Sequence, residues 1–318
     1  MDTSFLYTLW QGILWPVLRI CFFVSLGLVA ANLIESLAWS RRITRLAAPL
    51  TRLAHLSSST AAGFSLAFVS GVSANSLLAE AYGNGKIAKK ELVLANLLNS
   101  LPRFFLHLPT VFFLTLPFIH GTAFTYVGLT FIASLLQTAC VVGCGRLLLN
   151  KPAQAIEVKA QEEKQTDWGK WLPKMVKRLR RRLKRLLLFM LPIYIAFYLL
   201  AKYGIWASIK ELIVQLPLLS HLPAESLTII ILHVTAEFSA GLAAASVIMA
   251  ENSLSGQQIV LALMIGNLLA TPVRALRHQL PYYSGIYPLR IAIELILASQ
   301  ILRASCIILV TIIYYSWV

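Results

Sequence analysis

Residues 61–82 read AAGFSLAFVSGVSANSLLAEAY, an apolar stretch rich in glycine, serine and alanine. The run is as long as a membrane span, but the small and polar residues 70–75 interrupt it. The loop sequence Gly-Asn-Gly-Lys at 83–86 then ends it. Two half-helices that meet at small residues can pack together inside a membrane protein. The stretch therefore predicts a re-entrant helical hairpin, which enters the bilayer and leaves it on the same side.

The composition of the whole chain indicates a membrane protein. Of its 318 residues 58% are hydrophobic and 13% are charged, and the mean hydropathy is +0.73. Soluble domains have about 45–50% apolar and about 25% charged residues. The net charge of +15 comes from basic residues between the apolar stretches, as is typical of membrane loops and not of a nucleic-acid-binding face. We expect an all-α integral membrane protein with no nucleic-acid partner.

Several stretches are long enough to span the bilayer, which needs about 20 apolar residues. The predicted spans cover about 11–39, 91–119, 124–149, 186–203, 258–276 and 290–315. A second Gly/Ala/Ser-rich segment at about 226–251 predicts a second hairpin. Between the halves, residues 151–185 form a polar linker. Its densely basic part, 174–185, is expected to lie on the inner membrane face and to contact anionic headgroups.

The chain contains an internal repeat of its polar residues. A shift of 171 positions places Glu80 on Glu251, Asn96 on Asn267 and Arg103 on Arg274 without gaps. The first copy occupies 1–150 and the second 186–318. Each has three predicted crossings and one hairpin, and an odd number of crossings reverses the direction of the second copy. The sequence therefore predicts two inverted repeats, each with about three spanning helices and one re-entrant hairpin.

The loop charges give an independent prediction of orientation. Lys86, Lys89 and Lys90 follow the first hairpin, whereas residues 252–258 after the second hairpin contain no Lys or Arg. Loops rich in Lys and Arg stay in the cytoplasm. We therefore expect a multi-pass protein of the cell inner (cytoplasmic) membrane, with both termini outside the cytoplasm.

Polar residues that coincide across the repeat are candidates for a solute site. In transporters built from inverted repeats and broken helices, the site lies near the bilayer midplane. The candidate substrate-binding residues are Asn75, Asn96, Asn99, Ser100, Arg103, Ser246, Asn267, Thr271 and Arg274. The alternative is that the amides form hydrogen bonds between helices. The arginines could equally form structural ion pairs with Glu80, Glu237, Glu251 or Glu294.

Acidic residues of the hairpins are candidates for ion coupling. Glu237 follows His233 by one helical turn and is the strongest candidate for a proton- or cation-coupling carboxylate, with a structural partner for an arginine as the alternative. Glu80 and Glu251 at the hairpin ends are further candidates. Nucleotide-binding loops, metal-binding pairs and nucleophile elbows are missing from the sequence. We expect no enzyme activity, cofactor or metal, and a homo-oligomer remains an open alternative.

The residues 71–75 (GVSAN), followed by Glu91 and by the pattern Asn96-x-x-x-Ser100-x-Pro102-Arg103, resemble a known family. This pattern is similar to the gate, or nucleoside recognition, domain. That domain occurs in the membrane region of ferrous-iron transporter B and is similar to spore maturation proteins A and B. More distantly, it resembles concentrative nucleoside transporters.

Residues 240–274 resemble a second copy of this domain. Iron-transporting members have a cysteine beside the hairpin glycine, where this chain has Val72 and Ser73. The resemblance implies a secondary-transporter-like protein that moves a small solute or ion, with a nucleoside-like solute as one candidate. The alternative function is a non-transporting membrane scaffold or regulatory protein that acts through its basic linker.

Overall fold

The computed structural model describes residues 49–68, 70–150, 173, 176–177, 180, 223–235 and 237–317. The spans expected at 11–39 and 186–203 lie outside the described residues, as does most of the linker at 151–185. Within the described part the secondary structure is helical and no strand is present. The all-α prediction is therefore confirmed.

A pair of short helices occupies the first predicted hairpin. Helix α4 (Ser58–Ala67) packs against α5 (Gly71–Gly83). Ser70 begins α5 as its N-cap, because its side chain accepts a hydrogen bond from the backbone N–H of Ser73 at 3.2 Å. The first turn of α4 has no acidic residue of its own. Glu91 takes that role, since its Oε1 accepts from the backbone N–H of Ser57 at 2.8 Å.

The predicted span 91–119 is two helices with a short break. Helix α6 (Lys89–Leu98) is followed by α7 (Ser100–Ile119), and Asn99 separates them. Pro102 lies three residues after the break. A proline ring clashes with the carbonyl four residues earlier, here that of Leu98, which explains why α6 ends at that residue. Helix α8 (Thr122–Leu148) then runs back along α7.

The second half repeats this order of elements. Helices α11 (Ala224–Thr235) and α12 (Phe238–Ala250) form the second pair. Helix α13 (Gly256–Arg274) continues through the π-helix η2 (Ala275–Gln279) into α14 (Leu280–Ser284), eight residues beyond the predicted end at 276. Helix α15 (Leu289–Trp317) is the last element.

Four helical segments are long and apolar enough to cross a membrane. They are Lys89–Ile119, Thr122–Leu148, Gly256–Arg274 and Leu289–Trp317. Large apolar side chains on these segments are exposed, as Leu147 (86%) and Ile301 (66%) illustrate. Such surfaces are expected to face lipid. The chain is therefore a multi-pass membrane protein, as its composition predicts.

The spacing of the structural repeat differs from the spacing found in the sequence. Helix α5 begins at Gly71 and α12 at Phe238, 167 residues later, and the same difference separates the starts of α6 and α13 and of α8 and α15. At this spacing Gly85 corresponds to Asn252, and both have a positive φ. The expected shift of 171 is thus four residues too long. Four residues are about one helical turn, which preserves the helix face.

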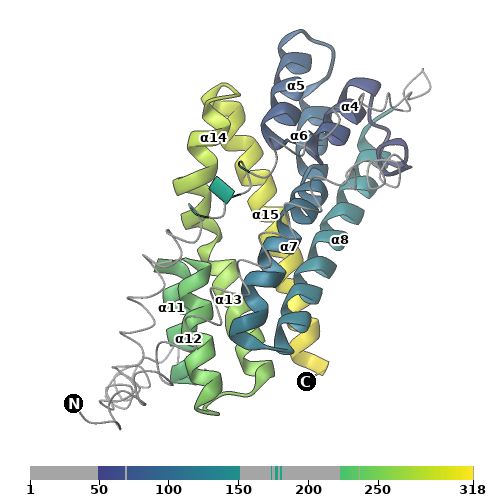
Figure 1. Cartoon of the computed structure of the whole chain (residues 1–318). Helices are drawn as coiled ribbons and strands as arrows, with labels where there is room; N and C mark the ends of the chain where they lie inside the picture. Colours follow the sequence, from purple (N-terminus) through teal and green to yellow (C-terminus); the bar gives the residue numbers. More distant parts are fainter. Residues whose placement is uncertain are drawn as a thin grey trace.

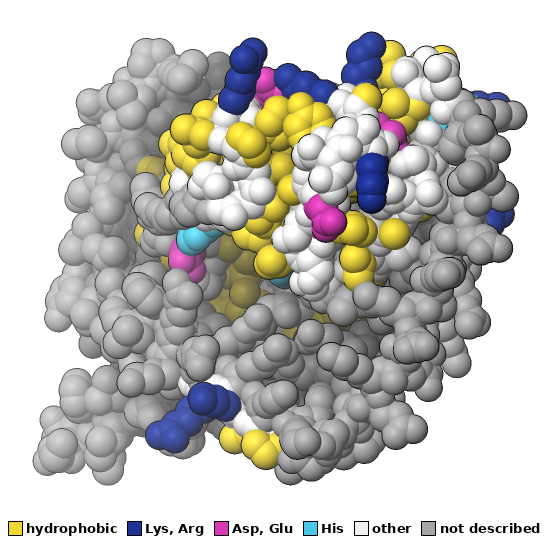
Figure 2. Space-filling model, turned by 90° about the horizontal axis from the view of Figure 1, so that it is seen from above, with side chains coloured by type: hydrophobic (Ala, Val, Ile, Leu, Met, Phe, Trp, Pro, Cys, Tyr) yellow, Lys and Arg dark blue, Asp and Glu magenta, His cyan; other side chains and the backbone are white. Residues whose placement is uncertain are grey.

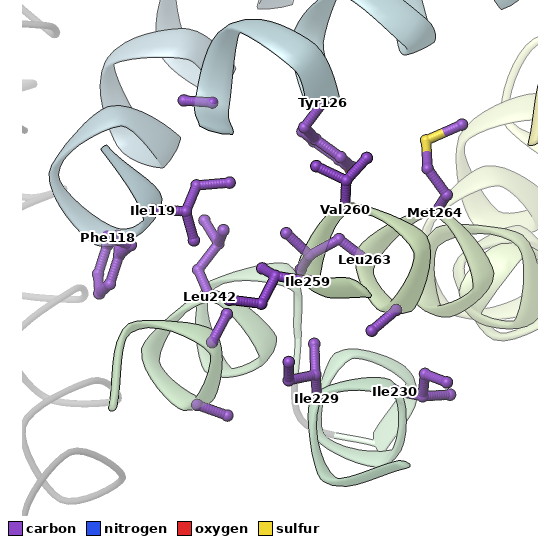
Figure 3. Close-up of a cluster of buried hydrophobic side chains, with 14 of the residues drawn as sticks. Phe118, Ile119, Tyr126, Ile229, Ile230, Leu242, Ile259, Val260, Leu263 and Met264 are labelled. Atoms are coloured by element: carbon purple, nitrogen blue, oxygen red, sulfur yellow. The ribbon is translucent and has the colours of Figure 1, made fainter. Parts of the chain in front are cut away.

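The two short-helix pairs lie at opposite ends of the long helices (Figure 1). Each pair contributes to a separate apolar core. One core packs α4, α5 and α6 against the ends of α8 and α15 that lie near them. The other packs α11, α12 and α13 against the α7–α8 turn, and Ile119, Leu242, Ile259 and Leu263 belong to this one buried cluster (Figure 3). The middle of the long helices therefore lies between two apolar cores.

Basic side chains gather at the end of the molecule that carries α4 and α5. Figure 2 views this end, and blue Lys and Arg side chains stand around an apolar surface there. The exposed basic residues of this end are Arg52, Lys86, Lys89, Lys90, Arg146 and Arg290. The loop between α12 and α13 at the other end is fully described and contains no Lys or Arg. The described loops therefore have the charge asymmetry expected from the sequence.

Candidate functional site

The N-terminal end of α5 is held by a network of amides and phenols. Asn75 and Asn96 are both buried, and Asn96 Nδ2 donates to Asn75 Oδ1 at 2.7 Å. The hydroxyl of Tyr287 donates to the same oxygen at 3.2 Å, and Asn75 Nδ2 donates to the hydroxyl of Tyr282 at 3.0 Å. Burial raises the pKa of both tyrosines, so they stay neutral and able to donate near pH 7. Asn75 therefore connects the first hairpin to the chain after α13.

Arg103 joins this network from α7. Its Nη2 donates to the hydroxyl of Tyr283 at 3.2 Å, and Tyr283 donates onward to Asn96 Oδ1 at 3.3 Å. The ring of Tyr283 stacks on that of Tyr287, with centroids 6.0 Å apart. The guanidinium is thus bound to a neutral phenol rather than to a carboxylate.

Asn267 is the centre of a second network, on α13. Its side-chain Oδ1 accepts from Arg274 Nη2 at 2.6 Å and from Arg303 Nη2 at 3.3 Å. The backbone carbonyl of Asn267 also accepts from Arg274 at 2.6 Å and from Thr271 Oγ1 at 3.0 Å. Its Nδ2 approaches the hydroxyl of Tyr126 on α8 at 3.5 Å. One amide group therefore holds two arginines from two different helices.

A cavity of about 240 Å³ lies between these networks. Both halves of the chain line it, through α6, α7 and α8 from the first and α12, α13, η2 and α15 from the second. Its polar lining residues are Asn96, Ser100, Arg103, His107, Tyr126, Thr130, Ser134, Gln137, Asn267, Arg274, Gln279, Ser299, Gln300 and Arg303. No Asp or Glu is among the described residues of this lining.

Several buried polar atoms, which belong to residues that line the cavity, have no hydrogen-bond partner within the described part of the chain. They are Oγ of Ser100, Oγ of Ser134 and Oε1 of Gln300. The amide nitrogen of Gln300 does have a partner, because it donates to Gln279 Oε1 at 2.5 Å. Buried polar groups are normally bonded, so unbonded ones beside a cavity are suited to a ligand or water.

The second hairpin is held against α13 by close packing around His233. A Cβ at Gly266 would lie 2.8 Å from His233 Nδ1, and one at Gly241 would lie 2.9 Å from His233 Cβ. The imidazole is buried and contacts the ring of Phe238, with centroids 5.2 Å apart. Neither ring nitrogen has a hydrogen-bond partner among the described residues. Small residues therefore bring α11, α12 and α13 into close contact here.

The candidate carboxylates lie away from the cavity. Glu80 and Glu251 are exposed near the ends of α5 and α12. Glu237 is exposed at the turn before α12, where its backbone carbonyl accepts from Ala240 N–H at 3.1 Å. Glu294 pairs with Lys89 at 2.5 Å and with Arg290 at 3.5 Å, not with an intramembrane arginine. The arginines of the cavity are therefore paired with amides and phenols in the described structure.

The structure brings five of the nine predicted substrate-binding residues to the cavity. These are Asn96, Ser100, Arg103, Asn267 and Arg274. Asn75 and Thr271 support the lining through their hydrogen bonds to Asn96 and Asn267. Asn99 and Ser246 are not among the lining residues. Asn99 is buried at the α6–α7 break, and Ser246 lies partly buried on α12.

The cavity and its networks also contain residues that the sequence alone does not mark as site residues: the tyrosines, Gln300 and Arg303. Arg303 carried a detectable signal, because Ser299, Gln300 and Arg303 are polar residues close together on one face of a mostly apolar helix. The tyrosines at 282, 283 and 287 have no such signal in the sequence, since they occur in a stretch that is predicted to be a loop. Their role depends on α13 continuing through η2 into α14.

Three archaeal proteins are similar to this chain over most of its length. All are uncharacterized proteins of Methanocaldococcus jannaschii. MJ1556 is 24% identical over 91% of this chain and 89% of its own length. MJ0880 is 21% identical over 85% and 88%, and MJ0871 is 22% identical over 89% and 88%. No protein-family model matches the sequence, and no solved structure matches it.

Proposed function

We propose that the protein is a secondary-transporter-like membrane protein that moves a small solute or ion through the central cavity. The observation that carries this proposal is the cavity itself, which lies between two hairpins and is lined by polar residues from both halves. A transporter of this class binds its solute where the two repeats meet. A nucleoside-like solute is one candidate, through the resemblance of residues 71–103 to the nucleoside recognition domain.

The proposal includes an inverted second half. The α4/α5 pair and the α11/α12 pair lie at opposite ends of the long helices (Figure 1), as inverted repeats require. Basic residues surround the α4/α5 end, and the positive-inside rule assigns such an end to the cytoplasm. Both termini would then lie outside the cytoplasm, in a cytoplasmic membrane.

A non-transporting scaffold is the competing function, and the cavity disfavours it. A scaffold needs no open space at its centre, and membrane helices without a functional reason pack tightly. The cavity instead leaves three polar atoms without partners in the described chain. Keeping such atoms unbonded in a low-dielectric region costs about 1–3 kcal/mol for each. A ligand that binds there would offset this cost.

The test is solute flux through purified, full-length protein in liposomes. Nucleosides, amino acids, organic anions and metal ions are offered in turn, and saturable uptake of one class is expected. Asn267→Ala should reduce this uptake at least about tenfold, because the amide positions Arg274 and Arg303. Gln257→Ala is the matched control, since this exposed amide lies outside the cavity. No saturable uptake of any class would leave the scaffold as the better account.

A further inference from the structure

The cavity has a strong excess of positive charge. Arg103, Arg274 and Arg303 all line it, and no acidic residue is part of the lining that the structure describes. We infer that its ligand is a compact anion with carboxylate or phosphate oxygens, bound by these three guanidinium groups. This inference rests on the proposed function, in which the cavity is the solute site.

The arginines keep donors available for a ligand. A guanidinium has five N–H donors in a planar fork that matches the oxygens of a carboxylate or phosphate. In the described structure each of the three arginines donates only through Nη2. All the acceptors are neutral: a phenol for Arg103 and the oxygens of Asn267 for the other two. Their positive charges are therefore hydrogen-bonded but not neutralised by the described residues.

An anion would remove an electrostatic cost that a neutral solute would leave in place. Charged groups in membrane segments are costly and usually pair with an opposite charge. Arg274 and Arg303 share one acceptor oxygen, so two like charges lie within a few ångströms of each other. Coulomb repulsion between them is strong at low dielectric constant. A cation would be repelled from this site, and an anion would be attracted.

The remaining wall also suits a small anion. The unpartnered hydroxyls of Ser100 and Ser134 can donate to its oxygens. Tyr126 and Phe238 stack with their centroids 5.6 Å apart and give the cavity an aromatic side. The volume of about 240 Å³ is below the roughly 300–1,000 Å³ of pockets for drug-sized ligands. The ligand is thus compact, such as a small carboxylate.

The test measures binding to the purified full-length protein by thermal shift and calorimetry. The probes are succinate and inorganic phosphate as anions, uridine as a neutral solute and choline as a cation. We expect at least one anion to raise the melting temperature, with no response to uridine or choline. Failure of both anions to bind, or binding of uridine or choline instead, would overturn the inference.

Substitution of Arg303 links the binding to the proposed residues. Hydrogen bonds to charged groups contribute enough that Arg303→Gln should weaken anion binding about 10- to 100-fold. Arg146→Gln is the control, because Arg146 is exposed and outside the cavity. If Arg303→Gln does not fold, Arg103→Gln serves the same purpose. Unchanged anion affinity in a folded cavity variant would refute the assignment.

Two further measurements test the inference. One asks whether the effect of Arg303→Gln comes from its charge, and the other distinguishes anion binding from transport. Without ligand, Arg303→Gln should melt at a higher temperature than the wild type, because it removes one of three repelling charges. A lower melting temperature would mean that the charge is already compensated within the protein, against the inference. Anion binding without any flux in liposomes would instead contradict the proposed transport function and leave the anion site supported.

Discussion

The close contact between α8 and the segment before α4 gives a sharp test of the packing. Gly145 and Gly143 lie two residues apart on α8. A Cβ at Gly145 would lie 2.5 Å from the carbonyl oxygen of Ala54 and 3.1 Å from its Cβ, whereas a Cβ at Gly143 meets nothing within 4 Å. Replacing each glycine by alanine therefore tests one steric contact in a matched pair.

The expected difference follows from these distances. Ordinary van der Waals contact needs about 3.5 Å, so Gly145→Ala forces the backbones apart by about 1 Å. Overpacking of this kind costs about 1–3 kcal/mol. Both substitutions gain a similar helix propensity, up to about 1 kcal/mol, which cancels in the comparison. Gly145→Ala should therefore be about 1–3 kcal/mol less stable than Gly143→Ala.

Equilibrium unfolding of the two variants in detergent micelles measures this difference. For a chain of 318 residues, 1 kcal/mol corresponds to roughly 1.5 °C in melting temperature, so thermal unfolding should show a difference of about 1.5–4.5 °C. Gly143→Ala controls for expression and for the loss of a glycine in a membrane helix. Equal stabilities would refute the close approach of α8 to Ala54.

Three other predictions concern a helix cap, the topology and the tyrosine network. Glu91→Ala should lower the free energy of unfolding by about 1–3 kcal/mol, because α4 loses the carboxylate that caps it; Glu91→Gln, which keeps an acceptor, should lose less. In a cysteine-free background, an impermeant thiol reagent should label Lys86→Cys only from the cytoplasm and Gln257→Cys only from outside; labelling of both from one side would contradict inversion. Stability should fall above about pH 10, where phenols of the unfolded chain ionise first. Since burial raises the folded-state pKa of Tyr287, Tyr287→Phe should reduce that fall, and an unchanged pH profile would contradict its buried position.

The helices could be predicted from the sequence because their signals are local. Runs of about 20 apolar residues indicated the spans, and the small residues at 70–75 indicated a break between half-helices. The break within 91–119 occurs at Asn99, three residues before Pro102. Proline acts on the preceding turn, so a break appears several residues before it.

The repeat shows where identity between residues misleads. Asn96 matches Asn267 in the sequence, yet Asn267 lies four residues further from the start of its helix. A shift of one turn leaves both amides on the same helix face. The spacing of polar residues in a sequence indicates the face of the helix on which they lie, not their position along its axis. Depth along the helix depends on where the helix begins. That is set by turns such as the one at Gly85, which has a positive φ.

Much of the candidate site could not be predicted, because it is formed by contacts between segments that are far apart in the sequence. Arg303 lies on α15 and reaches Asn267 on α13, 36 residues earlier, and Tyr287 reaches Asn75 across 212 residues. Neither pair has a spacing that a local pattern could reveal. From the sequence, carboxylates are the expected side-chain partners of the arginines within the chain, because opposite charges are the usual partners in a membrane. The structure instead supplies amide and phenol oxygens, which hold an arginine in place without neutralising it.

Both hairpins pack in apolar cores, but their contacts near the cavity differ, and this affects how the cavity can open. The tip of the first is bound through the hydrogen bonds of Asn75, which can exchange with water at little net cost. The second is packed through Gly241 and Gly266 around His233, and separating those surfaces sacrifices dispersion contacts that water cannot replace. For transport as proposed, we therefore expect the α4/α5 end to open more readily than the α11/α12 end. Because the α4/α5 end carries the basic side chains, an anion approaching from that side would be attracted towards the cavity before any helix moves.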